Sequence, residues 1–116
     1  MKLGAAAEDW VATRLFARGV QIRARNYRCR LGEIDLIAEH LNTLIFIEVK
    51  SSAQLCHARA SVDFHKQRKL RLTAAHYLSR FHWDGDCRFD VAAVSTDHDG
   101  NWRCDWTADA FTIDTC

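Results

Sequence analysis

Three charged side chains, Asp35, Glu48 and Lys50, interrupt two otherwise apolar runs of this chain. Two neighbouring carboxylates repel each other and raise one another's pKa, and a cation between them relieves that repulsion. Proteins commonly hold Mg²⁺ with one or two carboxylates, together with waters and substrate phosphates. The two acids therefore indicate a divalent-cation site, beside which Lys50 could activate or orient an attacking water. The alternative is a cross-strand cluster of ion pairs on a solvated face, because charges on exposed strand faces are common.

Residues 32–38 and 44–50 are predicted to form a β-hairpin that turns at His40–Thr43. Side chains alternate between the faces of a strand, so Glu48 and Lys50 share one face. If His40 pairs with Thr43, the register places Asp35 directly opposite Glu48, whereas an odd loop or a bulge would shift it. One face is then apolar and comprises Ile34, Leu36, Ala38, Ile45, Ile47 and Val49. The other is apolar near the turn and charged at the far end, and comprises Asp35, Ile37, Leu44, Phe46, Glu48 and Lys50.

The order of an aspartate, one β-turn and then Glu-x-Lys resembles the PD-(D/E)xK core of the restriction-endonuclease-like nucleases. A longer series of motifs is more specific, and consists of Gly4–Glu8, Arg25–Arg28, Gly32–Ile37, Phe46–Lys50, Lys66–Leu70 and Arg88–Val91. This series extends from about Leu3 to Val94 and resembles the small bacterial YraN family. The fold of that family is nuclease-like and related to archaeal Holliday-junction resolvases.

The resemblance implies a DNA endonuclease that depends on Mg²⁺ or Mn²⁺ and is similar to resolvases that cut branched DNA. It assigns the metal to Asp35 and Glu48, with Glu8 of the first helix as a further ligand. It gives Lys50 a role in assisting the nucleophile, and Gln67 a role in placing water or phosphate. For Glu8, the alternative is a carboxylate that stabilises the N-terminal half of a helix. For Gln67, the alternative is an exposed helical side chain.

A second class of function is a non-catalytic nucleic-acid-binding or protein-interaction module that retains the nuclease fold, since fold does not imply function. The presence of Asp35, Glu48 and Lys50 together argues against a decayed enzyme. Similar resolvases act as dimers because two symmetric cuts need two sites, so a homodimer is expected by analogy.

Charge is distributed unevenly along a chain whose net charge is only +1. Residues 1–30 carry seven Lys and Arg against two acids, whereas residues 84–116 carry eight Asp against two Arg. Basic segments that converge in space could follow a phosphate backbone, although most such charges belong to solvated faces. The candidate nucleic-acid contacts are Arg25, Asn26, Arg28, Arg30, Lys66, Arg68 and Lys69. For Asn26, the alternative is a role in a turn. Glu33 lies two residues before Asp35, and it is either a third carboxylate of the site or a solvated residue at the end of the strand.

The pattern as a whole predicts an α/β fold of one domain over residues 1–116, with a mixed central β-sheet flanked by a helix on each side, in the order αβββαββ. The predicted elements are a helix at 3–18, a strand at 20–27, the hairpin, a helix at 61–82, and strands at 87–95 and 102–106. Ser61 is expected to cap the second helix. Its expected buried face comprises Val62, Leu70, Ala74, Tyr77, Leu78 and Phe81. Arg88 and Asp90 are expected to be mainly structural.

Composition agrees with a globular chain, because 48% of the residues are hydrophobic and 27% are charged. No apolar run approaches the length of a membrane span, and the first residues do not resemble a signal peptide. The five cysteines form an odd set without Cys-x-x-Cys spacing. They argue against a disulfide framework and favour a reducing, cytoplasmic location.

Overall fold

The computed structural model describes residues 3–52 and 63–111. Its elements are α1 (Leu3–Ala17), β1 (Gln21–Cys29), β2 (Gly32–His40), β3 (Thr43–Ser52), α2 (Phe64–Arg80), β4 (Asp86–Thr96) and β5 (Trp102–Phe111). The predicted αβββαββ order is therefore confirmed. The last strand is longer than the predicted 102–106, and α2 is shorter than the predicted 61–82 within the described residues.

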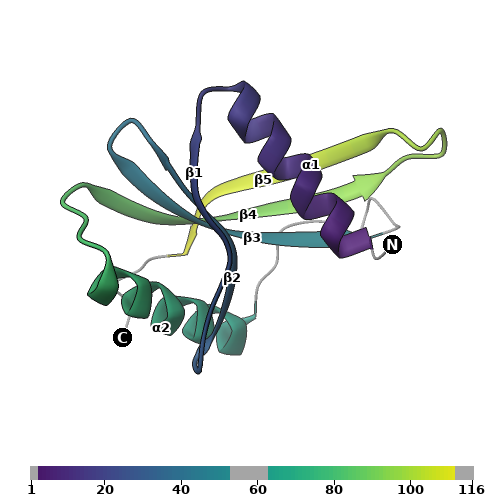
Figure 1. The fold of residues 1–116 in the computed structure, drawn as a ribbon. Helices are drawn as coiled ribbons and strands as arrows, with labels where there is room; N and C mark the ends of the chain where they lie inside the picture. The colour runs from purple at the N-terminus through teal and green to yellow at the C-terminus, as the bar shows by residue number, and fades with distance from the viewer. Residues whose placement is uncertain (1–2, 53–62, 112–116) are drawn as a thin grey trace.

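The five strands form one mixed sheet in the order β1-β2-β3-β4-β5. Neighbouring strands are antiparallel except β3 and β4, which are parallel. A parallel pair needs a long crossover, and here the crossover contains α2. The two helices lie on opposite faces of the sheet (Figure 1). The central strands β2, β3 and β4 therefore have buried side chains on both faces, one set under α1 and the other under α2.

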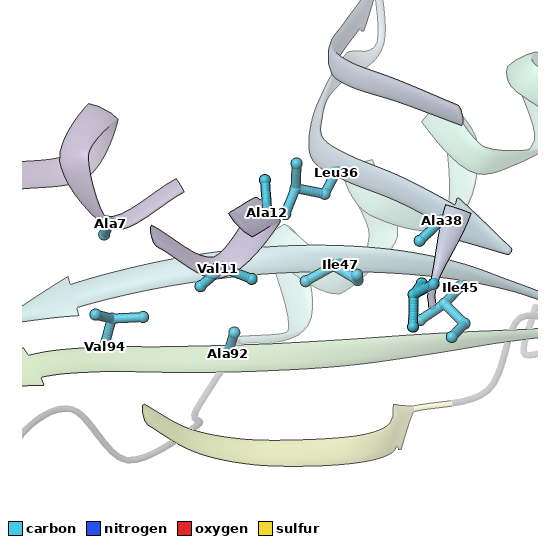
Figure 2. Close-up of a cluster of buried hydrophobic side chains, with 10 residues drawn as sticks. Ala7, Val11, Ala12, Leu36, Ala38, Ile45, Ile47, Ala92 and Val94 are labelled. Carbon is cyan, nitrogen blue, oxygen red and sulfur yellow. The ribbon is translucent and has the colours of Figure 1, made fainter. Parts of the chain in front are cut away.

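The core under α1 is built from small helix residues that allow close approach to the sheet (Figure 2). Ala7, Val11 and Ala12 of α1 are buried against branched and small side chains of three strands. The strand residues are Leu36 and Ala38 of β2, Ile45 and Ile47 of β3, and Ala92 and Val94 of β4. They alternate along each strand, as the predicted apolar face of the hairpin required.

The core under α2 contains the alternate side chains of the same strands, including Leu44, Phe46 and Phe89. Ile34 also belongs to this cluster, so the prediction that it shares a face with Leu36 is wrong. The regular pairing of β2 with β3 covers Leu36–His40 of β2. The part of β2 that precedes Leu36 bends toward α2 (Figure 1). This bend carries Ile34 to the α2 side.

On α2 itself, the predicted buried face is confirmed for Leu70, Ala74 and Tyr77. Phe81 departs from the prediction because it is 41% exposed at the helix end, although its ring stacks on Tyr77 at 4.6 Å. Val62 and the predicted cap Ser61 lie outside the described residues. The cap of α2 is Asp63, whose Oδ1 accepts the Lys66 N–H at 2.8 Å.

The β2–β3 hairpin has the predicted register, since His40 pairs with Thr43 and Leu36 with Ile47. Leu41 and Asn42 form the two-residue turn with φ of +48° and +63°. Two successive positive φ values are typical of a type I′ turn, whose twist matches that of the strands. The turn therefore sets which side chains of the two strands face each other.

A buried carboxylate, Asp90 of β4, connects β4 to β5 through hydrogen bonds. Its two oxygens accept from Arg88 Nε at 2.9 Å and Nη2 at 3.1 Å, from Trp106 Nε1 at 2.8 Å and from the Asp109 N–H at 2.9 Å. The network spans the irregularity in the β4–β5 register near Phe89. The predicted structural role of Arg88 and Asp90 is thereby confirmed.

No helix of the described residues is long and apolar enough to cross a membrane.

Candidate active site

The candidate site lies where β2 and β3 part. Their regular pairing ends at Leu36 and Ile47, one position before Asp35 and Glu48. Beyond that point, the Asp35 carboxylate bridges the strands, because its Oδ2 accepts the Val49 N–H at 2.7 Å. The predicted juxtaposition of Asp35 and Glu48 is therefore held by a side chain rather than by the ladder alone.

Glu48 is the most enclosed charge of the site, with a side chain only 10% exposed. The pKa of Glu48 is raised to about 7, chiefly by burial and then by the neighbouring negative charge of Asp35. Lys66 opposes this shift, because its Nζ lies 2.8 Å from Glu48 Oε2. The Lys66 ammonium thus compensates part of the charge of the carboxylate pair, and a divalent cation would relieve the repulsion that remains.

Glu8 reaches the same place from α1. Partial burial raises the pKa of Glu8, and the negative charges of Asp35 and Glu33 raise it further, while Arg25 lowers it. A hydrogen bond with Asp35 contributes to the shifts of both Glu8 and Glu48. Asp35 therefore stands between Glu8 and Glu48, and the structure brings together the three acids that the sequence predicted.

Asn26 connects Glu8 to Glu33, a fourth carboxylate beside this group. Oriented so that its amide satisfies both partners, its nitrogen lies 3.1 Å from Glu8 Oε1 and 3.2 Å from Glu33 Oε2. Its φ of +54° is a backbone region that Asn adopts more readily than most residues. Glu33 also accepts from Arg28 Nε at 2.9 Å. Asn26 therefore positions two carboxylates, a role that the sequence did not indicate.

Lys50 and Gln67 complete the set of predicted catalytic residues. Lys50 is half-buried on β3 and shares the strand face of Glu48 by alternation. Gln67 is half-buried near the start of α2, directly after Lys66, and its Oε1 accepts from Arg71 Nη1 at 3.4 Å. Lys50 thus lies on the strand that carries Glu48, and Gln67 lies on the helix that carries Lys66.

Three of the candidate nucleic-acid contacts are bound to carboxylates of the chain itself. Arg25 pairs with Asp9, Arg28 with Glu33, and Lys66 with Glu48. The helix period places Lys66 on the same face as the buried Leu70, four residues later, but it does not identify Glu48 as the partner of Lys66. The Asp35 bond to a backbone N–H had no signal in the sequence, because it depends on where the strands part.

The other basic candidates, Arg30, Arg68 and Lys69, are exposed. The tip of the β1–β2 hairpin approaches α2 closely, since a Cβ on Gly32 would lie 3.6 Å from Lys69 Cβ. The hairpin tip that carries Arg30 and the part of α2 that carries Lys69 thus lie close together.

The donor set suits Mg²⁺ or Mn²⁺, because carboxylate oxygens are the ligands that hard cations prefer. Within residues 3–52 and 63–111, however, no three His, Cys, Asp or Glu are arranged to hold one ion together. Asp35 and Glu48 are therefore the two carboxylates that could hold a metal without Glu8, and the Lys66 ammonium, 2.8 Å from Glu48 Oε2, would compete with it.

The fold and the site together define an α/β protein with a half-buried row of carboxylates at the point where two strands of a mixed sheet part. The chain belongs to the Uncharacterised protein family UPF0102, whose model matches residues 7–94. It is 50% identical over 94 residues to a UPF0102 protein of Methylococcus capsulatus, covering 79% of this chain and 76% of the relative. It is 43% identical over 114 residues to a UPF0102 protein of Methylobacillus flagellatus, covering 96% of this chain and 97% of the relative. A third UPF0102 protein, from Cupriavidus pinatubonensis, is 44% identical over 115 residues, with 97% and 87% covered.

Proposed function

We propose that this protein is a Mg²⁺- or Mn²⁺-dependent endonuclease that hydrolyses phosphodiester bonds of DNA, with branched DNA as its preferred substrate. The observation that carries the proposal is the row formed by Glu8, Asp35 and Glu48, in which burial and mutual repulsion raise the pKa of the two outer acids. A protein maintains such a repulsive cluster at a cost in stability, and clusters of this kind are enriched at functional sites. The proposal also rests on the resemblance of the Asp35, Glu48 and Lys50 spacing to the PD-(D/E)xK nucleases.

Asp35 and Glu48 would hold the metal, which supplies a more acidic bound water and stabilises charge on the phosphate. The protein's own groups have separate tasks. Lys50 holds and orients the attacking water. Lys66 favours the ionised form of Glu48 before the substrate arrives, because its ammonium lies 2.8 Å from that carboxylate and lowers its pKa. Asn26 holds Glu8 in line with Asp35 through its amide.

The second candidate is a nucleic-acid-binding module without catalysis. One observation favours it, since the 2.8 Å ion pair between Lys66 and Glu48 already supplies a cation to the buried acid. In that case the acidic row is a structural network, and the exposed basic residues around Gly32 carry the binding.

The decisive experiment incubates the wild type with a labelled panel of linear duplex, single strand, flap and four-way junction, with Mg²⁺ or Mn²⁺. The matched variants are Asp35→Asn, which keeps an oxygen to accept the Val49 N–H, and Asp105→Asn, which neutralises an exposed acid on the edge strand β5. We expect cutting by the wild type and by Asp105→Asn, and a loss of at least about a hundredfold in Asp35→Asn, since several kcal/mol of transition-state stabilisation are removed.

Binding without cutting by all three proteins, in either metal, contradicts the nuclease and supports the binding module. Equal cutting by the wild type and Asp35→Asn also contradicts the proposed site. Calorimetric titration of Mn²⁺ into the same proteins, without DNA, separates a missing metal site from a missing substrate, because only Asp35→Asn should lose the metal.

A further inference from the structure

A second hollow lies on the α1 face of the sheet, away from the carboxylate row. It is a half-open hollow of about 380 Å³ between α1 and residues of strands β2, β3, β4 and β5. Strand alternation separates the two places, because Ile45 of the hollow and Glu48 of the row point to opposite faces of β3. Arg14, which lines the hollow, is also about 9 Å further along α1 than Glu8, at roughly 1.5 Å per residue.

The hollow, which we term the α1 pocket, is cationic. Arg14, Arg18 and Arg88 line it, and no Asp or Glu stands among the described residues of its wall. Arg88 is partly neutralised by the buried Asp90 behind it. The two N–H groups that Arg88 gives to Asp90 leave three of its five donors for a ligand. Burial raises the pKa of the Cys104 thiol in the same wall, so that this group adds no negative charge.

Apart from His40 and Cys104, the remaining wall consists of indole rings and aliphatic side chains. The indoles of Trp10 and Trp106 and the side chains of Val11 and Leu15 line it. The Arg14 guanidinium lies 4.7 Å from the Trp10 ring centroid, so this arginine is already held over an aromatic surface. The hollow is within the range of small-molecule sites, which are mostly apolar and carry a few convergent polar groups.

Two chemical requirements on the ligand follow. Guanidinium groups match phosphate oxygens in charge and in fork geometry, and several around one hollow favour a phosphorylated ligand. An apolar wall with indole rings favours a flat aromatic body on the same molecule. We propose that the α1 pocket binds a nucleoside phosphate, with its phosphate on the arginines and its base against the Trp and aliphatic wall.

This binding site lies beyond the proposed nuclease function, because it uses none of the carboxylates of the row. The same chemistry has two sources. One is a free nucleotide, and the other is the phosphorylated terminal nucleotide of a nucleic-acid strand.

The test is a calorimetric titration of the whole protein with AMP, adenosine and inorganic phosphate, in a metal-free buffer. We expect AMP to bind at least about tenfold more tightly than either fragment. The variant Arg14→Gln/Arg18→Gln should weaken AMP binding by about tenfold or more, because it removes two charged donors from the phosphate. The control Arg80→Gln removes a charge from the exposed end of α2, on the other face of the sheet, and should bind AMP as the wild type does.

Absence of AMP binding at millimolar concentration, or equal binding by the wild type and the double variant, overturns the proposal. Asp35→Asn should bind AMP with the affinity of the wild type. If this variant loses AMP binding while the arginine double variant retains it, the nucleotide binds at the carboxylate row and not in the α1 pocket. The source is resolved by competition with a six-nucleotide strand, with and without a 5′-phosphate. Displacement of AMP by the phosphorylated strand alone identifies a strand end, and no displacement by either strand identifies a free nucleotide.

Discussion

Glu48 links the stability of the protein to pH. Its pKa is raised from an ordinary 4.5 to about 7 in the folded chain, chiefly by burial and then by Asp35. The folded state therefore binds more protons than the unfolded state between these values, and the free energy of unfolding falls as pH rises through that window. We expect the metal-free wild type to be most stable near pH 4.5 within this range and to lose stability toward pH 7, as measured by urea denaturation at each pH.

The variant Glu48→Gln should flatten most of this dependence, because the amide does not titrate. A smaller slope should remain, since partial burial raises the pKa of Glu8 in the same direction. Asp105→Asn, an exposed change on β5, should keep the wild-type profile. An unchanged profile in Glu48→Gln would show that other groups dominate this pH range.

The sequence predicted that Asp35 and Glu48 lie close together, but it did not predict their other partners. Strand alternation and turn length predicted the register of the hairpin from Leu36–Ile47 to the turn, and they placed Asp35 and Glu48 just beyond the end of that ladder, where the two carboxylates interact. The ion pair of Lys66 with Glu48 and the bridge made by Asn26 join elements far apart in sequence. Such contacts depend on the packing angle of α2 and on the course of β1, and no local pattern encodes either.

At the scale of elements, the approach of β2 to α2 depends on one missing side chain. A Cβ on Gly32 would lie 2.8 Å from Thr73 Oγ1 of the buried helix face. We expect Gly32→Ala to lower the free energy of unfolding by about 1–3 kcal/mol, the usual cost of overpacking. Gly4→Ala is the matched control, because nothing lies within 4 Å of a Cβ there and alanine favours the helix.

A double-mutant cycle locates the cause of that loss. Thr73→Ala removes the hydroxyl that the new methyl would contact, so Gly32→Ala/Thr73→Ala should recover part of the stability lost by Gly32→Ala. Denaturation midpoints and slopes of the four proteins measure the coupling. Strict additivity would mean that the cost arises from the β2 backbone and not from the contact with α2.

The element order was fully predictable, whereas the faces of the hairpin were predictable only in part. The assignments of Leu36, Ile45 and Ile47 were right because the β2–β3 ladder is regular there. Ile34 was misassigned because β2 bends away after the ladder ends, and alternation along one strand cannot reveal a bend toward a helix.

At the scale of the whole molecule, sheet order separates the charges. The basic strand β1 and the aspartate-bearing strand β5 lie at opposite edges of the sheet (Figure 1). Since the net charge is only +1, attraction of a nucleic acid depends on the local patch rather than on the overall field. The exposed residues Arg30, Arg68 and Lys69, near the acidic row, are the expected phosphate contacts.

This arrangement gives a salt-dependent prediction that distinguishes exposed from internally paired arginines. With the Asp35→Asn background and a four-way junction, the logarithm of the binding constant should fall linearly with the logarithm of salt concentration. Arg68→Gln should reduce the slope by about 0.9 for one lost phosphate contact. Arg25→Gln should change it little, because Arg25 is already paired with Asp9. Fluorescence anisotropy across a salt series measures both slopes. An equal reduction of the slope by the two variants would mean that the ion pair between Arg25 and Asp9 opens on binding. In that case β1 itself contacts the nucleic acid.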